Sequence, residues 1–175
     1  MKKYSLYFLL LFCFLNANLQ SQNSLKLSAH QDLKLLLVGD NKGNNAGTLD
    51  VISKLKFEAK EKELGFFIFG IEYERANLQN NFTRVGGFFG YSFKPFKYTP
   101  DFVISPAIGY GSIMREDVNV GSYTAHLQIY YQLNNFIRAS VLNQFTQRSD
   151  LRVLYNDEKL RFSFFVGLEI NLFNF

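Results

Sequence analysis

Few side chains of this 175-residue chain have the types and spacing that chemistry requires. Glu72 and Glu74 are the clearest pair, because carboxylates two residues apart in a strand lie about 7 Å apart on one face. Carboxylates at about that separation can hydrolyse glycosides. Lys54 and Lys56 repeat the spacing in the preceding segment, however, and they favour ion pairs with the two glutamates over a hydrolytic site.

The two histidines, His30 and His126, are far apart in the sequence and belong to no metal-binding motif. The asparagine- and glycine-rich stretch 40–45 lacks the glutamate that completes a calcium loop. His126 shares a polar face with Thr124 and Gln128, so we expect a histidine that hydrogen-bonds to its neighbours. The sequence predicts no metal and no cofactor.

Alternation of apolar and polar residues predicts the strands that position these side chains. In residues 122–133, Tyr123, Leu127 and Ile129 fall on one face, whereas His126 and Gln128 fall on the other. The same pattern predicts eight strands, at residues 24–38, 49–60, 65–75, 83–93, 102–114, 122–133, 136–146 and 161–175. Eight strands fit one closed barrel, so we expect an all-β, eight-stranded antiparallel up-and-down β-barrel.

The N-terminus has the layout of a secretory signal peptide. Lys2 and Lys3 precede an apolar run at residues 4–15, which is too short for a comfortable membrane-spanning helix. We therefore expect residues 1–21 to be cleaved and residues 22–175 to form a single domain, with an uncleaved N-terminal anchor as the alternative. The only cysteine, Cys13, would leave with the signal, so no disulfide is expected.

Alternation alone does not say which face of the barrel is outside. The apolar faces are rich in Leu, Ile, Phe and Tyr, and the chain has 20 Phe, 10 Tyr and no Trp. Aromatic residues near strand ends, Gly and Ser on the polar faces, and longer loops at one end are typical of a membrane barrel, so we expect a transmembrane β-barrel. Loss of Lys2 and Lys3 would lower the 19 basic residues to 17 against 15 acidic ones, which gives no argument for nucleic acid.

Charges on the polar faces would then occupy a narrow lumen and would need partners. Antiparallel pairing of residues 49–60 with 65–75 brings Lys54 and Lys56 close to Glu72 and Glu74. We expect a plug of mixed charge that also includes Lys26, His30 and Arg84. The residues that define this interior ion-pair plug are Lys54, Lys56, Glu58, Glu72, Glu74, Arg138 and Glu169.

The last residues, GLEINLFNF, resemble the C-terminal assembly signal of outer-membrane barrels in Gly167, Ile170, Leu172 and Phe175. Phe175 departs in parity from Ile170 and Leu172, which predicts a kink or an overrun of the strand. The chain as a whole resembles the small outer-membrane barrels of the OmpA-transmembrane-domain or OmpX type. The resemblance implies location in the cell outer membrane, contact with its lipid and lipopolysaccharide, recognition by the barrel assembly machinery through the C-terminal strand, and a monomer.

Some eight-stranded outer-membrane barrels are lipid A deacylases with a serine two residues after a histidine. Here that position is Gln128, which cannot be a nucleophile, so we expect a protein that is not an enzyme. Arg148, Arg152, Tyr155 and Lys159 in the longest loop, 146–159, are the candidate interaction residues, either in an outward hairpin or in a contact patch. The alternatives are a soluble lipocalin-like barrel that binds an apolar ligand and an outer-membrane lipid-modifying enzyme.

Overall fold

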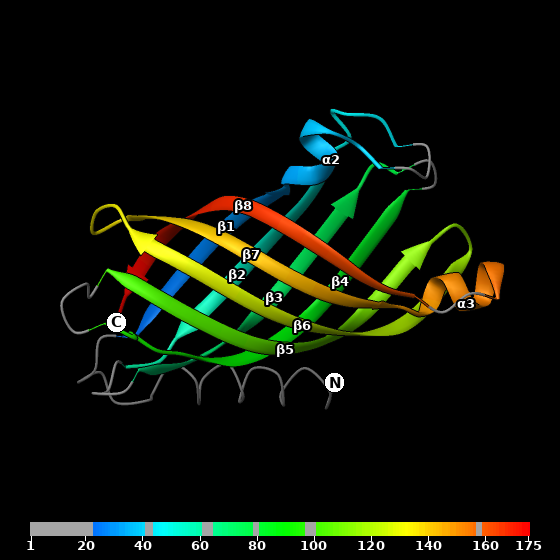
Figure 1. The fold of residues 1–175 in the computed structure, drawn as a ribbon. Helices are drawn as coiled ribbons and strands as arrows, with labels where there is room; N and C mark the ends of the chain where they lie inside the picture. Colours follow the sequence, from blue (N-terminus) through cyan, green and yellow to red (C-terminus); the bar gives the residue numbers. More distant parts are fainter. Residues whose placement is uncertain (1–22, 41–43, 61–64, 79–80, 97–100, 157–158) are drawn as a thin grey trace, which may run out of the picture.

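Eight antiparallel strands close into a barrel (Figure 1). The computed structural model describes residues 23–175, apart from residues 41–43, 61–64, 79–80, 97–100 and 157–158, so the expected signal peptide lies outside the described residues. The strands are β1 Ser24–Asp32, β2 Asp50–Glu58, β3 Phe66–Ala76, β4 Phe82–Ser92, β5 Phe102–Arg115, β6 Val118–Gln132, β7 Ile137–Arg148 and β8 Lys159–Asn174. Two short helices are α2 Leu33–Leu37 and α3 Ser149–Tyr155. Neither these nor any other helix of the described residues has the length and apolar character to cross a membrane.

Each strand pairs with the next along the chain, and β8 returns to pair with β1. The predicted eight-stranded antiparallel up-and-down barrel is therefore confirmed. The β6–β7 turn contains three residues, because the Leu133 amide donates to the Ile137 carbonyl over 3.0 Å. This odd number keeps Leu133 and Ile137 on the same face of the sheet.

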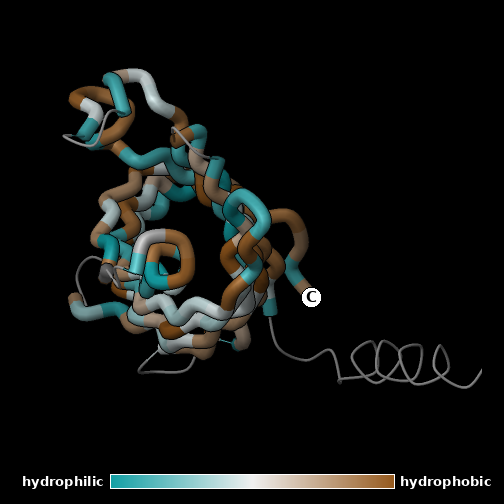
Figure 2. Tube along the Cα trace, turned by 90° about the vertical axis from the view of Figure 1, so that its right-hand side faces the viewer, coloured by the Kyte–Doolittle hydropathy of each residue, from teal (hydrophilic) through white to brown (hydrophobic). Residues whose placement is uncertain are grey.

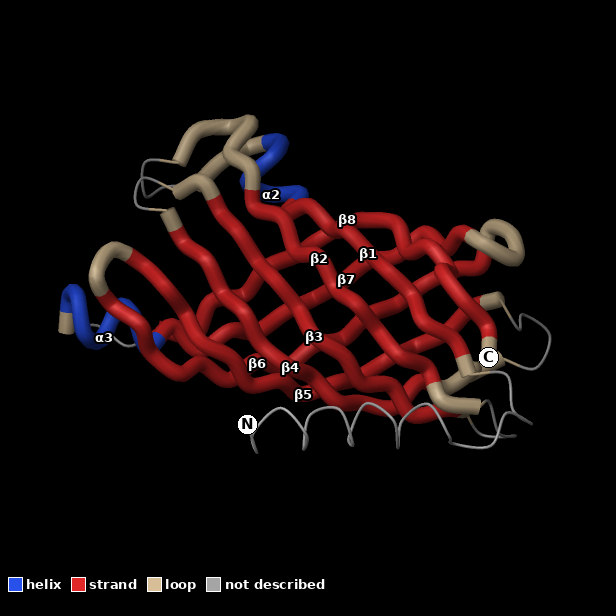
Figure 3. Tube along the Cα trace, turned by 180° about the vertical axis from the view of Figure 1, so that it is seen from behind, coloured by secondary structure: helices blue, strands red, loops and turns tan. Residues whose placement is uncertain are grey.

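The barrel has two dissimilar ends. The connections that contain α2 and α3, together with the β3–β4 and β5–β6 connections, lie at one end, which we call the loop end. The other end, the terminus end, carries the start of β1, the end of β8 and the remaining three connections. Figure 3 shows both helices at one end and the C-terminus at the other.

The first predicted strand, 24–38, is wrong beyond Asp32. There the chain turns into α2, because the Asp32 carboxylate accepts a hydrogen bond of 3.0 Å from the Leu35 amide and so caps the helix. Within α2, Leu35 is buried, whereas Leu37 is exposed. The parity that placed both leucines on one strand face therefore does not apply there.

Two predicted loops also contain regular structure. Residues 149–155 form the helix α3 rather than a hairpin extension, and α3 ends at Asn156 in the left-handed conformation. Between the predicted strands 102–114 and 122–133, β6 already begins at Val118, because Val120 packs against the buried cluster that includes Phe82 and Ile113. Only Glu116 and Asp117 remain between β5 and β6.

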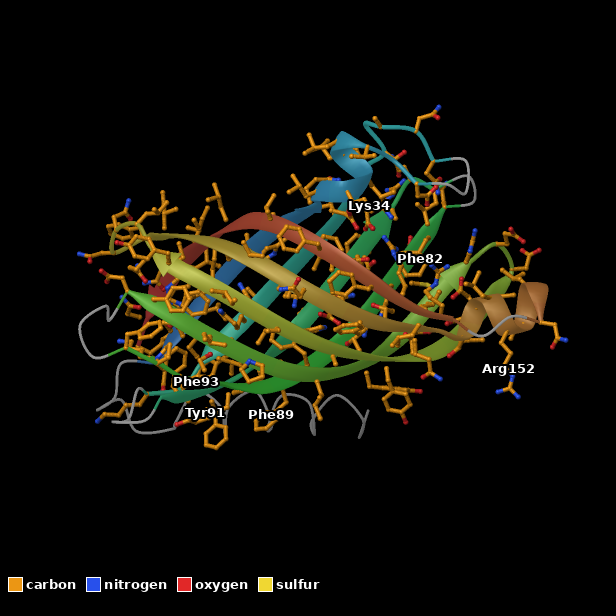
Figure 4. The ribbon with its side chains drawn as sticks, viewed as in Figure 1. Lys34, Phe82, Phe89, Tyr91, Phe93 and Arg152 are labelled. Carbon is orange, nitrogen blue, oxygen red and sulfur yellow. The ribbon has the colours of Figure 1, made fainter. Side chains whose placement is uncertain are left out.

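The apolar faces of the strands point outward and the charged faces point inward. Ile108 is 70% exposed and Phe89 is 54% exposed, whereas Lys54 is 2% exposed and Arg84 is fully buried. Figure 2, which looks along the barrel from the loop end, shows the strands as a ring of alternating hydrophilic and hydrophobic residues. In Figure 4, Phe89 and Tyr91 extend away from the barrel wall. Outer aromatic residues also contact each other, as in the Tyr110–Tyr123 pair, whose ring centroids are 5.0 Å apart.

The parity change at the C-terminus has a structural cause. Lys26 pairs with Asn171 while Leu25 pairs with Phe173, so Leu172 is an extra residue, a β-bulge in β8. The bulge keeps Phe173 on the outer side beside Phe175, with ring centroids 6.3 Å apart. The Phe175 amide donates to the Asn23 carbonyl over 2.8 Å, so pairing between the two termini continues to the last residue.

Candidate functional site

The lumen is lined by charged side chains that pair with each other. Strand alternation sends every second residue inward, and on β2 this places Asp50, Ile52, Lys54, Lys56 and Glu58 inside. All five are buried. Burial of so many charges is costly unless each has an opposite charge or a hydrogen-bond partner, and the lumen supplies these in three successive clusters.

The cluster nearest the terminus end joins three cations to two carboxylates. Lys56 Nζ lies 2.6 Å from a Glu169 carboxylate oxygen and 3.0 Å from one of Glu58. Arg138 Nη1 lies 2.8 Å from Glu58 and 3.0 Å from Glu169, and Lys26 Nζ lies 3.3 Å from Glu58. Arg138 is on β7 and Glu58 is on β2, so this pair bridges strands that are not neighbours in the sheet.

The middle cluster is centred on Glu72. Its carboxylate lies 3.5 Å from Lys54 Nζ, 3.3 Å from His126 Nε2, and forms an ion pair with Arg84. Lys54 Nζ is also 3.2 Å from His126 Nδ1. The expected approach of Lys54 to Glu72 is present, whereas His126 contacts charged residues of other strands rather than its own neighbours Thr124 and Gln128.

The cluster nearest the loop end is centred on Arg161, which forms ion pairs with Asp50, Glu74 and Asp32. Gln144 also donates to Glu74 over 3.0 Å. Glu74 therefore takes these partners instead of the expected lysines, and Lys56 takes Glu58 and Glu169. The reason is register: Glu74 is opposite Ile52, and Lys56 is opposite Gly70.

Three buried aromatic rings, which the sequence reasoning missed, separate these charges. Phe82 packs under the Arg148 guanidinium, whose carbon is 4.5 Å from the ring centroid, and Phe88 lies 5.0 Å from Lys54 Nζ. Tyr130 lies 4.7 Å from Lys56 Nζ and 4.5 Å from the Arg138 guanidinium carbon. Strand alternation could have indicated that Phe82 and Phe88 point inward, because both lie an even number of residues from Arg84.

His30 and Ser140 form a hydrogen bond of 2.7 Å across the inner face of β8. Both residues pair in register with Gly167, His30 from β1 and Ser140 from β7. A Cβ atom at Gly167 would lie 2.7 Å from the His30 ring and 2.1 Å from the Ala29 carbonyl oxygen. Both side chains are buried, so this pair is placed for a structural hydrogen bond rather than for attack on a substrate.

The other C-terminal residues of the resemblance lie on the outer wall. Ile170 is 47% exposed and Phe175 is 48% exposed, and Leu172 is exposed at the bulge. These three side chains are exposed on the outer wall, in or directly after the strand β8 that pairs with β1.

The candidate interaction loop does not hold all four predicted residues together. Arg148 is the last residue of β7, is buried, and donates two hydrogen bonds to Asp150, of 2.8 and 2.6 Å. It was wrongly placed in the exposed loop because the strand continues inward to Arg148 and the aspartate two residues later faces it. Arg152 is exposed and points away from α3 in Figure 4, while the side chains of Tyr155 and Lys159 lie outside the described residues.

Asp150 fixes α3 to the barrel. Burial alone would raise the pKa of its carboxyl group, but the hydrogen bonds and positive charge of Arg148, aided by Arg115, hold that pKa below its ordinary value. Arg115 Nη1 lies 3.4 Å from the same carboxylate. The helix is therefore joined to β7 and β5 by charged groups.

Metal chemistry finds no support in the described part of the chain, where no three His, Cys, Asp or Glu side chains are arranged to hold an ion. His126, the residue of the deacylase comparison, has Gln128 beside it on β6 and charged partners around it. The arrangement lines the lumen with charged side chains that pair across it and leaves an apolar outer wall.

The chain is similar to solved structures, two of which are described in turn. The crystal structure of Ail, the attachment invasion locus protein of Yersinia pestis, is similar over 87% of this chain and 99% of that chain, with a TM-score of 0.53 and 10% sequence identity. A de novo designed transmembrane β-barrel is similar over 87% of this chain and 96% of that chain, with a TM-score of 0.45 and 16% identity. Neither a protein-family model nor a curated protein sequence matches the chain. The likeness to Ail is one of fold, a closed β-barrel.

Proposed function

We propose that this chain is an integral protein of the cell outer membrane, with a plugged polar lumen and a non-enzymatic role in structure or surface interaction. The observation that carries the proposal is the inversion of the usual arrangement of a soluble protein. Exposed Leu, Ile, Phe and Tyr cover the wall, while lysine, arginine and glutamate are buried inside. Hydrocarbon is the solvent in which this arrangement is stable.

The same arrangement argues against a soluble barrel that binds an apolar ligand, because such a barrel needs its apolar face inside. The fold of Ail, a protein named for attachment and invasion, supports a surface role at the loop end. There the exposed leucines of α2 are available for apolar contacts. Arg152 is available for contact with lipopolysaccharide phosphates.

The proposal has three further parts, which concern export, assembly and oligomeric state. Residues 1–21 act as a cleaved signal peptide, and the C-terminal strand with Gly167, Ile170, Leu172 and Phe175 is recognised by the barrel assembly machinery. The protein then functions as a monomer. The outward position of Ile170, Leu172 and Phe175 supports the second part, because a partner can reach them.

Cell fractionation combined with gel mobility tests the proposal. The protein should be in the outer-membrane fraction, require detergent for extraction, and migrate differently in unboiled and boiled samples, because the closed barrel resists detergent until heated. The N-terminus of the mature protein, read by mass spectrometry, tests the cleavage. Recovery of the protein in the soluble fraction with unchanged mobility would overturn the proposal.

A further inference from the structure

The terminus end of the lumen contains a cavity of about 290 Å³. Ser24, Lys26, Glu58, Lys94, Arg138 and Asn174 are among the residues that line it. A space of this size holds roughly ten waters at their volume in the liquid, so it can take a small solute with part of its hydration.

The charge around this cavity is unbalanced. Among the described residues, Lys26, Lys56 and Arg138 share the carboxylates of Glu58 and Glu169, which leaves one positive charge in excess within this cluster. Lys94 and Asp101, which also line the cavity, carry opposite formal charges. Further along the lumen, Lys54 and Arg84 share the carboxylate of Glu72, but three carboxylates share Arg161, so the positive excess belongs to the terminus-end cluster. Charge that is buried without a counter-charge is costly, so an anion in the cavity would lower the free energy of the folded barrel.

Hydrogen-bond donors also remain at the cavity wall. Arg138 donates through its Nε to Gln132 and through its Nη1 to Glu58 and Glu169. Its Nη2 has no hydrogen-bond partner among the described residues. Within the part of the chain that the structure describes, Lys26 has a single carboxylate partner for three N–H donors. Asn174 accepts a hydrogen bond through its side-chain oxygen, which leaves its amide N–H groups for another acceptor.

From this geometry we infer that the terminus-end cavity binds a small oxyanion, held by Lys26, Arg138 and Asn174. An oxyanion presents several acceptor oxygens, which match one guanidinium edge and one ammonium group. The cavity lies at the terminus end, so binding there requires no part of the loop end.

The test uses the folded protein in maltoside micelles, which carry no charge and no phosphate. Inorganic phosphate and, separately, acetate are added at constant ionic strength, with chloride as the reference, while amide NMR signals of residues 24–26, 132 and 174 are followed. We expect saturable shifts with at least one of the two oxyanions, and the tighter one identifies the preferred group. Lys26→Met should weaken that binding about tenfold or more, as expected for loss of one charge-assisted hydrogen bond.

The matched control is Lys34→Met, which removes the same charge from an exposed position at the loop end and should leave binding unchanged. If Lys26→Met fails to fold, as judged by gel mobility, Lys94→Met at the exposed rim is used and should weaken binding in the same direction. Absence of saturable shifts with both oxyanions would overturn the inference. Equal binding by the cavity variant and the Lys34 variant would overturn it as well. A soluble protein that still binds would refute the membrane proposal but not this site.

Discussion

His30 on β1 and Ser140 on β7 are joined by a hydrogen bond of 2.7 Å that passes over Gly167 on the strand between them. The contact is possible because residue 167 has no side chain. The hydrogen bond between His30 and Ser140 thus requires a glycine at position 167, inside the segment that resembles an assembly signal.

Gly167→Ala should therefore destabilise the barrel by about 1–3 kcal/mol, the usual cost of overpacking. The added methyl group would meet the Ala29 carbonyl and the His30 ring. Gly87→Ala is the matched control, because a Cβ at that strand position meets nothing closer than the Gly70 carbonyl oxygen at 3.6 Å. Urea unfolding in lipid vesicles measures both variants. Equal midpoints would show that Gly167 has no packing role.

Lys56 and Glu169 form another contact across an intervening strand, since β1 separates β2 from β8. Lys56→Met should cost about 3–5 kcal/mol, because it removes the buried ammonium group that lies 2.6 Å from Glu169 and 3.0 Å from Glu58. Adding Glu169→Gln should recover part of that loss, so the double variant should be more stable than the sum of the single effects predicts. Lys34→Met, at an exposed position, should change stability by less than about 0.5 kcal/mol. Strict additivity of the two lumen substitutions would refute the coupling.

Much of this fold could be predicted from the sequence, because strand alternation reports directly on faces. Residues 122–133 alternate without a break, and all of their predicted strand except the last residue is in β6. The stretch Leu33–Leu37 misled the same reasoning, because the leucines keep the alternation while the Asp32 cap selects a helix. Lumen pairs such as Arg138–Glu58 could not be predicted, because contacts between non-neighbouring strands depend on how the closed barrel is staggered.

The free-energy cost of a charged residue on the outer wall should depend on its depth in the bilayer. Leu127→Arg, in the central part of β6, should cost about 2–4 kcal/mol in a bilayer, because arginine there faces hydrocarbon. Leu133→Arg, the same change just beyond the end of β6, should cost about 0–1 kcal/mol. The free energy of unfolding in vesicles measures the difference. Similar costs at both positions would contradict a bilayer whose midplane lies near the middle of the strands.

Acid should release α3 before the barrel unfolds. The folded-state pKa of Asp150 is lowered by Arg148 and Arg115, so its ion pairs contribute fully above the ordinary carboxyl pKa of about 3.9. That contribution is lost as the pH falls through the lowered folded-state value. Amide hydrogen exchange of residues 151–154 should therefore be unchanged from pH 7 to about pH 5, apart from its intrinsic pH dependence, and lose protection below about pH 4. Asp150→Asn should remove the protection at neutral pH, and a wild-type transition near pH 6 would contradict the assignment.

The central claim, that the apolar wall faces lipid, can be measured directly because the chain has no tryptophan. A single tryptophan is introduced at Ile108, in the middle of β5, or at Phe136, in the β6–β7 turn, and both positions are well exposed. The folded variants are placed in bilayers of lipids brominated near the ends of their acyl chains. Strong quenching of Ile108→Trp with weak quenching of Phe136→Trp is the predicted result. Equal quenching at the two positions, or none at Ile108→Trp, would contradict a membrane-spanning barrel.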